Sequence, residues 1–287
     1  MDTEVQPSAF SWTIRNGSLS YKDRILLMGI LNVTPDSFSD GGNFYTPEHA
    51  LLRAKELVED GADLLDIGAE STRPGSEMIS ADEELSRLIP ALKIIRDAVD
   101  LPISIDTYKS KTAREALKFG ADIINDVWGL LYDPEMAEVV AEYKAGVVIM
   151  ANYTNEKIFR REGGIVDDCL RYFEKSAAVA EKAGIAKNTI LFDPGIGFGT
   201  DTKEALELLA AIPMIREKGY PLLIVPSRKR FVGEILNGVP ADQRDAGTAA
   251  VSIFCQEKKA ACVRVHNVFE SCTALKMYLA MKGAENG

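Results

Sequence analysis

Polar and charged side chains recur along this chain directly after short apolar runs. They supply two kinds of chemistry. Asp106, Asn125 and Asp193 offer acceptors and amides that suit a ring bearing N–H and NH₂ groups. A second set is cationic or can become so, and it suits an anion: Arg73, Arg228, Lys229, Arg264 and His266. Together the two sets fit a substrate with an N-heterocycle at one end and a phosphate at the other.

Helix capping is the simpler explanation for any one polar residue after an apolar run. Here, however, such residues follow all eight runs, which capping alone does not explain. The stretch 28–42 is typical: it leaves an apolar run at Asn32 and continues into a loop rich in hydroxyls, carboxylates and glycines. Near the C-terminus, Ser227 is expected to cap a helix whose N–H groups would add to the cationic pair Arg228-Lys229.

The elements that must position these residues follow from the apolar pattern. Eight strands are expected: Ile25–Leu31, Leu64–Ile67, Ile103–Asp106, Asp122–Asn125, Val147–Met150, Thr189–Asp193, Leu222–Val225 and Cys262–Val265. Eight helices are expected between and after them: Pro47–Asp60, Ala81–Val99, Ser110–Phe119, Pro134–Lys144, Asp167–Ala183, Thr202–Lys218, Gln243–Glu257 and Phe269–Lys282.

Nearly continuous apolar strands alternating with helices indicate a parallel sheet covered by helices. The number and length of the units predict an α/β fold of the (β/α)8 TIM barrel type, whose active site lies at the carboxyl ends of the strands. An open doubly wound sheet is the alternative, but no G-x-G-x-x-G loop follows the first strand. Asn16-Gly17 predicts a short N-terminal β-hairpin. The expected division is therefore an N-terminal extension over 1–24 and a single catalytic domain over 25–287.

Composition limits the class of protein. The apolar content of 46% and charged content of 26% are typical of a globular chain, and no apolar run is long enough to cross a bilayer. A net charge of −10 argues against a nucleic-acid partner. The N-terminus has no secretion signal, and the four cysteines form no C-x-x-C motif, so a cytoplasmic location is expected. Two histidines are too few for a histidine-based metal site.

Seven motifs, taken together and in this order, resemble dihydropteroate synthase, a pterin-binding enzyme family of folate biosynthesis. The resemblance covers nearly the whole chain from residue 25 onward. The motifs are MGILNVTPDSFSDGG at 28–42, DIGAESTRPG at 66–75, IDTYK at 105–109, INDVWG at 124–129, LFDPGIGFG at 191–199, SRK at 227–229 and RVHNV at 264–268.

The resemblance implies a (β/α)8 barrel and a transferase reaction. In that reaction 6-hydroxymethyl-7,8-dihydropterin pyrophosphate condenses with 4-aminobenzoate to give 7,8-dihydropteroate and pyrophosphate. Pyrophosphate leaves before the aniline nitrogen attacks, and the pocket stabilises a cationic pterin. Asp106 would offset that cation. The residues implied in pterin binding are Asp106, Asn125, Met150, Asp193, Gly197 and Lys229.

Two further sets follow from the same resemblance. Pyrophosphate would be handled by Asn32, Arg73, Arg264 and His266, with Mg²⁺ bound near Asn32. The 4-aminobenzoate wall would be built by Thr72, Arg73, Pro74, Phe198, Ser227 and Lys229. The catalytic set is Asp106, Lys229, Asn32, Arg264 and His266. Loops 33–45 and 69–78 would close over the site, with Gly41-Gly42 as a hinge. A homodimer through outer helices near the C-terminus is expected, and the small residues of helix 243–257 would allow close packing.

Three places depart from the family pattern: Ala151 follows Met150 where histidine is common, Val225-Pro226 precedes the S-R-K motif, and Arg230 follows it. The segment 225–230 is therefore expected to reshape the aminobenzoate end and to alter sulfonamide sensitivity. These departures also leave two alternatives open. One is a non-catalytic pterin-binding paralogue, and the other is a pterin-dependent methyltransferase. Retention of the pyrophosphate set argues against the first. The TPDSFSDGG and STRPG loops and the basic cluster argue against the second, because a methyltransferase would not need them.

Overall fold

Eight parallel strands form the centre of the molecule. The computed structural model describes residues 10–21, 24–34, 46–71 and 78–285. The strands are β3 (Leu26–Asn32), β4 (Leu64–Gly68), β5 (Ile103–Asp106), β6 (Ile123–Asp126), β7 (Gly146–Met150), β8 (Ile190–Asp193), β9 (Leu223–Ile224) and β10 (Cys262–Val265). Their order is β8-β7-β6-β5-β4-β3-β10-β9, and a parallel bridge between Phe192 and Leu222 joins the two edges. The predicted barrel is confirmed, nearly closed and parallel throughout.

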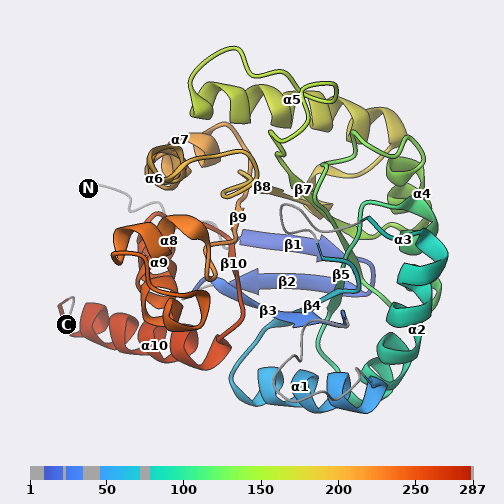
Figure 1. Cartoon of the computed structure of the whole chain (residues 1–287), viewed down its shortest axis with the longest axis horizontal. Coiled ribbons are helices and arrows are strands. Elements are labelled where there is room, and N and C mark those ends of the chain that lie inside the picture. The colour runs from blue at the N-terminus through green and yellow to red at the C-terminus, as the bar shows by residue number, and fades with distance from the viewer. Residues whose placement is uncertain (1–9, 22–23, 35–45, 72–77, 286–287) are drawn as a thin grey trace, which may run out of the picture.

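Helices surround the barrel as a ring (Figure 1). They are α1 (Pro47–Glu59), α2 (Ala81–Ala98), α3 (Ser110–Lys118), α4 (Met136–Tyr143), α5 (Ile165–Ala183), α6 (Thr202–Ala210), α7 (Ile212–Glu217), α8 (Arg230–Ile235), α9 (Asp245–Glu257) and α10 (Val268–Glu285), with short 3₁₀ helices η2 (Lys187–Thr189) and η3 (Ala241–Gln243). Alternate strand residues such as Leu65, Ile67 and Ile105 face outward and pack into one large core with the helices.

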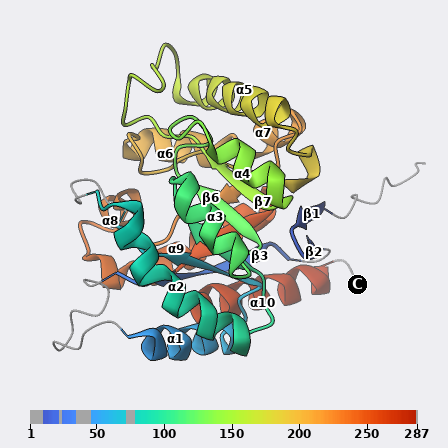
Figure 2. The ribbon, with the colours of Figure 1, turned by 90° about the vertical axis from the view of Figure 1, so that its right-hand side faces the viewer.

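The other strand face fills the barrel interior. Toward the amino-terminal end of the barrel this interior is apolar and includes Met28, Leu64, Ile123 and Leu191. The predicted hairpin, β1 (Phe10–Ile14) and β2 (Gly17–Tyr21), closes this end, and it crosses the middle of the helix ring in Figure 1 and lies to one side in Figure 2. Trp12 is fully buried there, and its indole N–H donates to the Thr189 carbonyl at 2.8 Å. The hairpin therefore plugs the amino-terminal end of the barrel.

Three local expectations are wrong. The single helix expected over 202–218 is two helices, because Pro213 has no N–H to continue the α6 ladder. The seventh strand is only two residues long and lies between Pro221 and Pro226, neither of which can donate to a neighbouring strand. The helix expected to start directly after Ser227 begins at Arg230 instead.

No helix within the described ranges is long and apolar enough to cross a membrane. The division into residues 1–24 and a single domain over 25–287 stays a prediction, because part of the extension lies outside the described residues.

Candidate active site

Strand pairing brings the predicted polar residues to one end of the barrel. Asn32 pairs with Gly68, Gly68 with Asp106, and Asp106 with Asn125, while Met150 pairs with Asp193. Because parallel strands end at the same rim, these side chains meet at the carboxyl-terminal mouth. Gly68 has no side chain between its neighbours, and the position a Cβ would take there lies 3.5 Å from the Asp106 Cβ and 3.6 Å from the Asn32 Oδ1.

Arg264 connects several of these strands. Its Nε donates to the Asp66 Oδ2 at 2.6 Å and its Nη2 to the Asp106 Oδ2 at 2.8 Å. The side chain of Asn125 donates to the same Asp66 oxygen at 3.2 Å. Asp66, Asp106, Asn125 and Arg264, which we call the mouth cluster, come from four different strands. The Oδ1 atom of Asp106 is buried and has no hydrogen-bond partner among the described residues.

Lys229 lies beside this cluster with its ammonium 4.4 Å from the centre of the Phe198 ring, a cation–π geometry. Gly197 makes room for it: its φ is +89°, and a Cβ there would lie 3.0 Å from the Lys229 Cδ. Burial lowers the pKa of Lys229 to about 8, because the charged form loses water, although Asp193 and Asp106 act in the opposite direction.

Burial raises the pKa values of the acids in this site, because it disfavours their charged form as well. It raises the pKa of Asp106 to about 7, a shift that Arg264 opposes and Asp66 reinforces. It also raises the pKa of Asp193 to about 6, against the hydrogen bond from the Gly195 N–H at 2.8 Å. Two acids and a lysine with shifted pKa values in one buried site are a common mark of a functional centre.

His266 and Ser227 form a pair at the end of β10. The Ser227 Oγ accepts the main-chain N–H of His266 at 3.0 Å and lies 2.9 Å from its Nδ1. The expectation that Ser227 caps a helix is therefore wrong: α8 is preceded by Lys229, which makes no side-chain capping bond. Arg228 binds the Asp245 carboxylate through Nε and Nη2, both at 2.7 Å, so these two nitrogens are not left for a substrate anion.

An apolar group lines the other side of the mouth. Met150, Tyr108 and Val127 are buried together, and the partly buried Trp128 and Phe198 pack against them. Planar apolar and aromatic surfaces beside acceptor groups suit a flat heterocycle. The predicted positions of Met150 and Phe198 thus belong to one surface.

Some expected site residues lie outside the described residues: Thr72, Arg73, Pro74, most of the loop 33–45 and the hinge Gly41-Gly42. Of the departures, Ala151 and Pro226 are buried, whereas Arg230 is exposed and its guanidinium contacts the Thr200 carbonyl at 3.3 Å and the Glu234 carboxylate at 3.3 Å.

The sequence reasoning missed Asp66 as a member of the site. Its signal was present, because Leu64, Asp66 and Gly68 share one strand face and a carboxylate is unusual in a fully buried strand. It also missed a buried network behind β4 and β5, in which Lys109 binds the carboxylates of Glu70 and Glu84. Glu70 also accepts the N–H of Ile79 at 3.1 Å, so this network joins the two stems of the loop between β4 and α2.

Comparison with known proteins agrees with this geometry. The family model described as pterin binding enzyme matches residues 28–266. The dihydropteroate synthase of Bacillus subtilis is 45% identical over 264 residues, which cover 92% of this chain and 91% of that protein. The structure of Xanthomonas albilineans dihydropteroate synthase with 4-aminobenzoic acid has a TM-score of 0.89 at 38% identity, covering 96% of this chain and 99% of that one.

A second structure of the Xanthomonas enzyme, in complex with 7,8-dihydropteroate, has a TM-score of 0.85 at 37% identity and covers 95% of this chain and 98% of that one. The chain therefore belongs to the dihydropteroate synthase family of pterin-binding enzymes, the transferases that form 7,8-dihydropteroate in folate synthesis.

Proposed function

We propose that the mouth cluster and Lys229 carry out the family's condensation of 6-hydroxymethyl-7,8-dihydropterin pyrophosphate with 4-aminobenzoate. Asp106, Asn125 and Asp193 accept the N–H groups of the pterin, and Lys229 donates to it. Met150 and Gly197 bound the ring. The observation that carries this assignment is the buried Oδ1 of Asp106, beside Asn125 and Arg264, which has no hydrogen-bond partner within the described part of the chain. A buried acceptor without a partner is costly unless a ligand satisfies it.

Asp106 also has a catalytic role in this proposal. Departure of pyrophosphate leaves positive charge on the pterin, and a carboxylate already fixed near that charge stabilises it without reorganising. Arg264 keeps Asp106 in place through its Nη2, at 2.8 Å. Burial raises the pKa of Asp106, and Arg264 opposes that rise and so favours the ionised form that the role requires.

The pyrophosphate end is assigned to Asn32, Arg73, Arg264 and His266. The Ser227 hydroxyl already accepts the main-chain N–H of His266, so we assign its hydrogen to the imidazole Nδ1. That hydrogen bond leaves the proton of a neutral imidazole on Nε2, where it can be donated to a leaving oxygen. Ser227 thus supports the anion site, in addition to its assigned place beside 4-aminobenzoate.

His266→Ala tests the anion end. The inhibition constant for inorganic pyrophosphate should rise about tenfold, the loss expected for one hydrogen bond to a charged group, while affinity for 6-hydroxymethyl-7,8-dihydropterin stays unchanged. His49→Ala, at the only other histidine, is the control. Unchanged pyrophosphate inhibition in His266→Ala would refute the assignment.

Mg²⁺ is the proposed cofactor, with Asn32 as its protein ligand. Magnesium prefers oxygen donors and bridges phosphates, so it would neutralise the charge on the leaving group. The amide oxygen of Asn32 lies 3.6 Å from the position that a Cβ on Gly68 would take. Within the described residues no group of three or more His, Cys, Asp or Glu could hold a metal ion, so in this proposal water and the phosphate oxygens of the substrate supply other ligands.

4-Aminobenzoate is assigned to the outer side of the same mouth. Phe198 and Lys229 are neighbours there, with the ammonium 4.4 Å from the ring centre. An aromatic face and a cation suit a benzoate, because one can stack on the ring and the other can attract its carboxylate. Thr72, Arg73 and Pro74 complete the proposed wall, together with Ser227.

A coupled assay for pyrophosphate release tests the proposed function. The purified chain with Mg²⁺, the dihydropterin pyrophosphate and 4-aminobenzoate should release pyrophosphate and form 7,8-dihydropteroate in equal amounts. Omitting 4-aminobenzoate is the control. Tight pterin binding without turnover would instead identify a non-catalytic paralogue.

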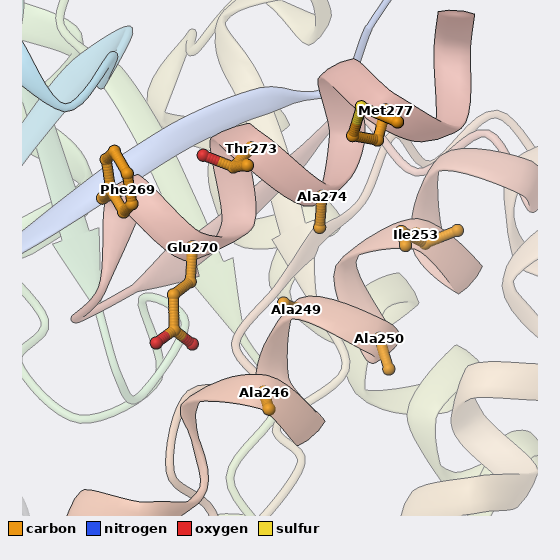
Figure 3. A pocket seen from close by; sticks show the side chains of 9 residues that line it. All are labelled: Ala246, Ala249, Ala250, Ile253, Phe269, Glu270, Thr273, Ala274 and Met277. Carbon is orange, nitrogen blue, oxygen red and sulfur yellow. The ribbon is translucent and has the colours of Figure 1, made fainter. Parts of the chain in front are cut away.

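We also propose a homodimer through the outer face of α9 and α10. A groove of about 410 Å³ lies between these helices (Figure 3), lined by Ala246, Ala249, Ala250, Ile253, Phe269, Glu270, Thr273, Ala274 and Met277. Phe269 and Met277 are 60% and 58% exposed, which is unusual for large apolar side chains. Gly247 does not belong to this face, because it packs against Val232 of α8.

Molecular mass by light scattering tests the dimer. Phe269→Glu should convert a dimer into a monomer, because it places a charge in an apolar contact. Leu52→Glu is the matched control, since Leu52 on α1 is 59% exposed but lies away from this groove. A monomeric unsubstituted chain, or a dimer that survives Phe269→Glu, would exclude this interface.

A cytoplasmic location is proposed as well. The four cysteines are all buried and unpaired, which suits a reducing compartment: Cys169, Cys255, Cys262 and Cys272. Cell fractionation with the tagged chain tests it.

A further inference from the structure

We propose that Asp66 is a positioning residue that decides which atoms Asn125 and Arg264 present to the substrate. The inference rests on the proposed function of the mouth cluster. Asp66 is fully buried on β4, and its Oδ2 accepts from both of these side chains, at 3.2 Å from the Asn125 Nδ2 and 2.6 Å from the Arg264 Nε.

The first consequence concerns the amide of Asn125. A carboxylate can only accept, so the nitrogen of the amide must be the atom that faces Asp66. The carbonyl Oδ1 of Asn125 then faces the other way and has no hydrogen bond within the described part of the chain. Asn125 therefore offers the substrate an acceptor, as Asp106 does with its Oδ1, which no described residue binds. Without Asp66 the amide could rotate and offer a donor instead.

The second consequence concerns the guanidinium of Arg264. Asp66 takes Nε and Asp106 takes Nη2, so two edges of the planar group are fixed. The remaining nitrogen, Nη1, has no hydrogen-bond partner among the described residues, which leaves it for an anion. The guanidinium is thus pre-oriented before the substrate binds, and less conformational entropy is lost on binding.

Asp66 thereby links the two ends of the substrate. The Asp66 Oδ2 orients both the Asn125 acceptor that recognises the heterocycle and the Arg264 donor that is directed to the pyrophosphate. A residue with a merely structural role would affect stability without this paired effect. Its own strand partner offers the contrast: Ser104 pairs with Asp66 in the sheet, is fully buried, and makes no side-chain hydrogen bond among the described residues.

Three variants test this. Asp66→Leu has nearly the same shape but no acceptor, Asp66→Asn can keep an oxygen at the shared position, and Ser104→Ala is the matched control. Binding is measured by calorimetry with two separate probes, 6-hydroxymethyl-7,8-dihydropterin and inorganic pyrophosphate with Mg²⁺. We expect Asp66→Leu to weaken both about 10- to 100-fold, Asp66→Asn to weaken each by less than about fivefold, and Ser104→Ala to change neither.

Equal losses in Asp66→Asn and Asp66→Leu would overturn the proposal, because orientation by the shared oxygen would then not matter. So would a folded Asp66→Leu with unchanged binding of either probe. Should Asp66→Leu fail to fold, Asp66→Asn decides: a loss above about fivefold in the folded protein contradicts the inference, and a smaller loss supports it. Turnover of the unsubstituted chain is measured alongside, so failure of the proposed function is seen separately.

Discussion

The two ends of one barrel differ in what fills them. At the amino-terminal end the interior is apolar and closed by Trp12 and Ile14 of the hairpin. At the carboxyl-terminal end the same strands carry the buried Asp66 and Asp106, which are paired with the partly buried Arg264. Burying charges costs free energy that pairing does not fully restore, whereas burying apolar surface is favourable. One end of the barrel therefore supplies stability, and the other supplies the groups for binding and chemistry.

The largest effect is expected at the closed end. Trp12→Ala should lower the free energy of unfolding by about 3–5 kcal/mol, because it removes a fully buried side chain and its hydrogen bond to Thr189. Urea denaturation measures the loss. The folded variant should keep kcat/KM within about twofold, since the mouth is untouched. Ser11→Ala, an exposed neighbour on β1, is the control and should change stability by less than about 0.5 kcal/mol. A comparable loss of activity in folded Trp12→Ala would break the division between the ends.

Asp106→Asn should have the opposite effect to Trp12→Ala: it should lower activity without lowering stability. It keeps the shape and an oxygen for Arg264 but removes the charge that offsets the cationic pterin. We expect kcat/KM to fall about 10²–10³-fold. The free energy of unfolding at pH 7 should not fall, because an uncharged side chain is less costly to bury. Steady-state kinetics and urea denaturation on the same preparation check both halves. Wild-type activity in this variant would remove Asp106 from the catalytic set.

Stability and catalytic activity should also respond oppositely to pH. The folded-state pKa values of Asp106, about 7, and Asp193, about 6, lie above the usual 3.8, so the folded state holds more protons between these limits. Their contribution to stability is therefore fully present below pH 3.8 and is lost as pH rises through 6 to 7. Urea denaturation from pH 4 to 8 should show this decline, and Asp106→Asn should reduce it.

Activity should rise over the same range. Ionised Asp106 is needed for catalysis, so kcat/KM should increase up to pH of about 7. It should fall above pH 8 as Lys229, whose pKa is lowered to about 8, loses its proton. Lys229→Arg should abolish the alkaline fall, because arginine stays charged. An unchanged alkaline limb in that variant would show that another group causes it.

The smallest effect is expected at the rim segment 225–230. Pro226→Gly with Arg230→Ser should change sulfonamide inhibition constants by about two- to fivefold, because Arg230 is exposed and directed to Thr200 and Glu234 rather than into the mouth. Lys203→Ser, another exposed cation nearby in the ring, is the control. Identical constants for the double variant and the unsubstituted chain would mean that this segment does not shape the aminobenzoate end.

Much of the architecture follows from local pattern. Apolar runs such as Val147–Met150 and helical spacing such as that in Pro47–Asp60 predicted element types correctly, because side-chain periodicity reflects which face is buried. Two expectations were wrong: a single helix over 202–218, and a helix that starts directly after Ser227. In the first case Pro213 interrupts an otherwise periodic helix, and in the second the chain makes a turn at Arg228 with φ of +56° before the helix begins.

Acceptors and cations at the strand ends of a barrel could be recognised in the sequence, and motif resemblance assigned them to a pterin and a pyrophosphate. How these groups combine became visible only in the folded chain. The fold joined Asp66 to Arg264 across 198 positions of sequence, turned Arg228 away to Asp245, and placed Ser227 on His266. The physical reason is that composition and period fix which face a residue occupies, whereas barrel closure and strand register fix which residues of distant strands share that face.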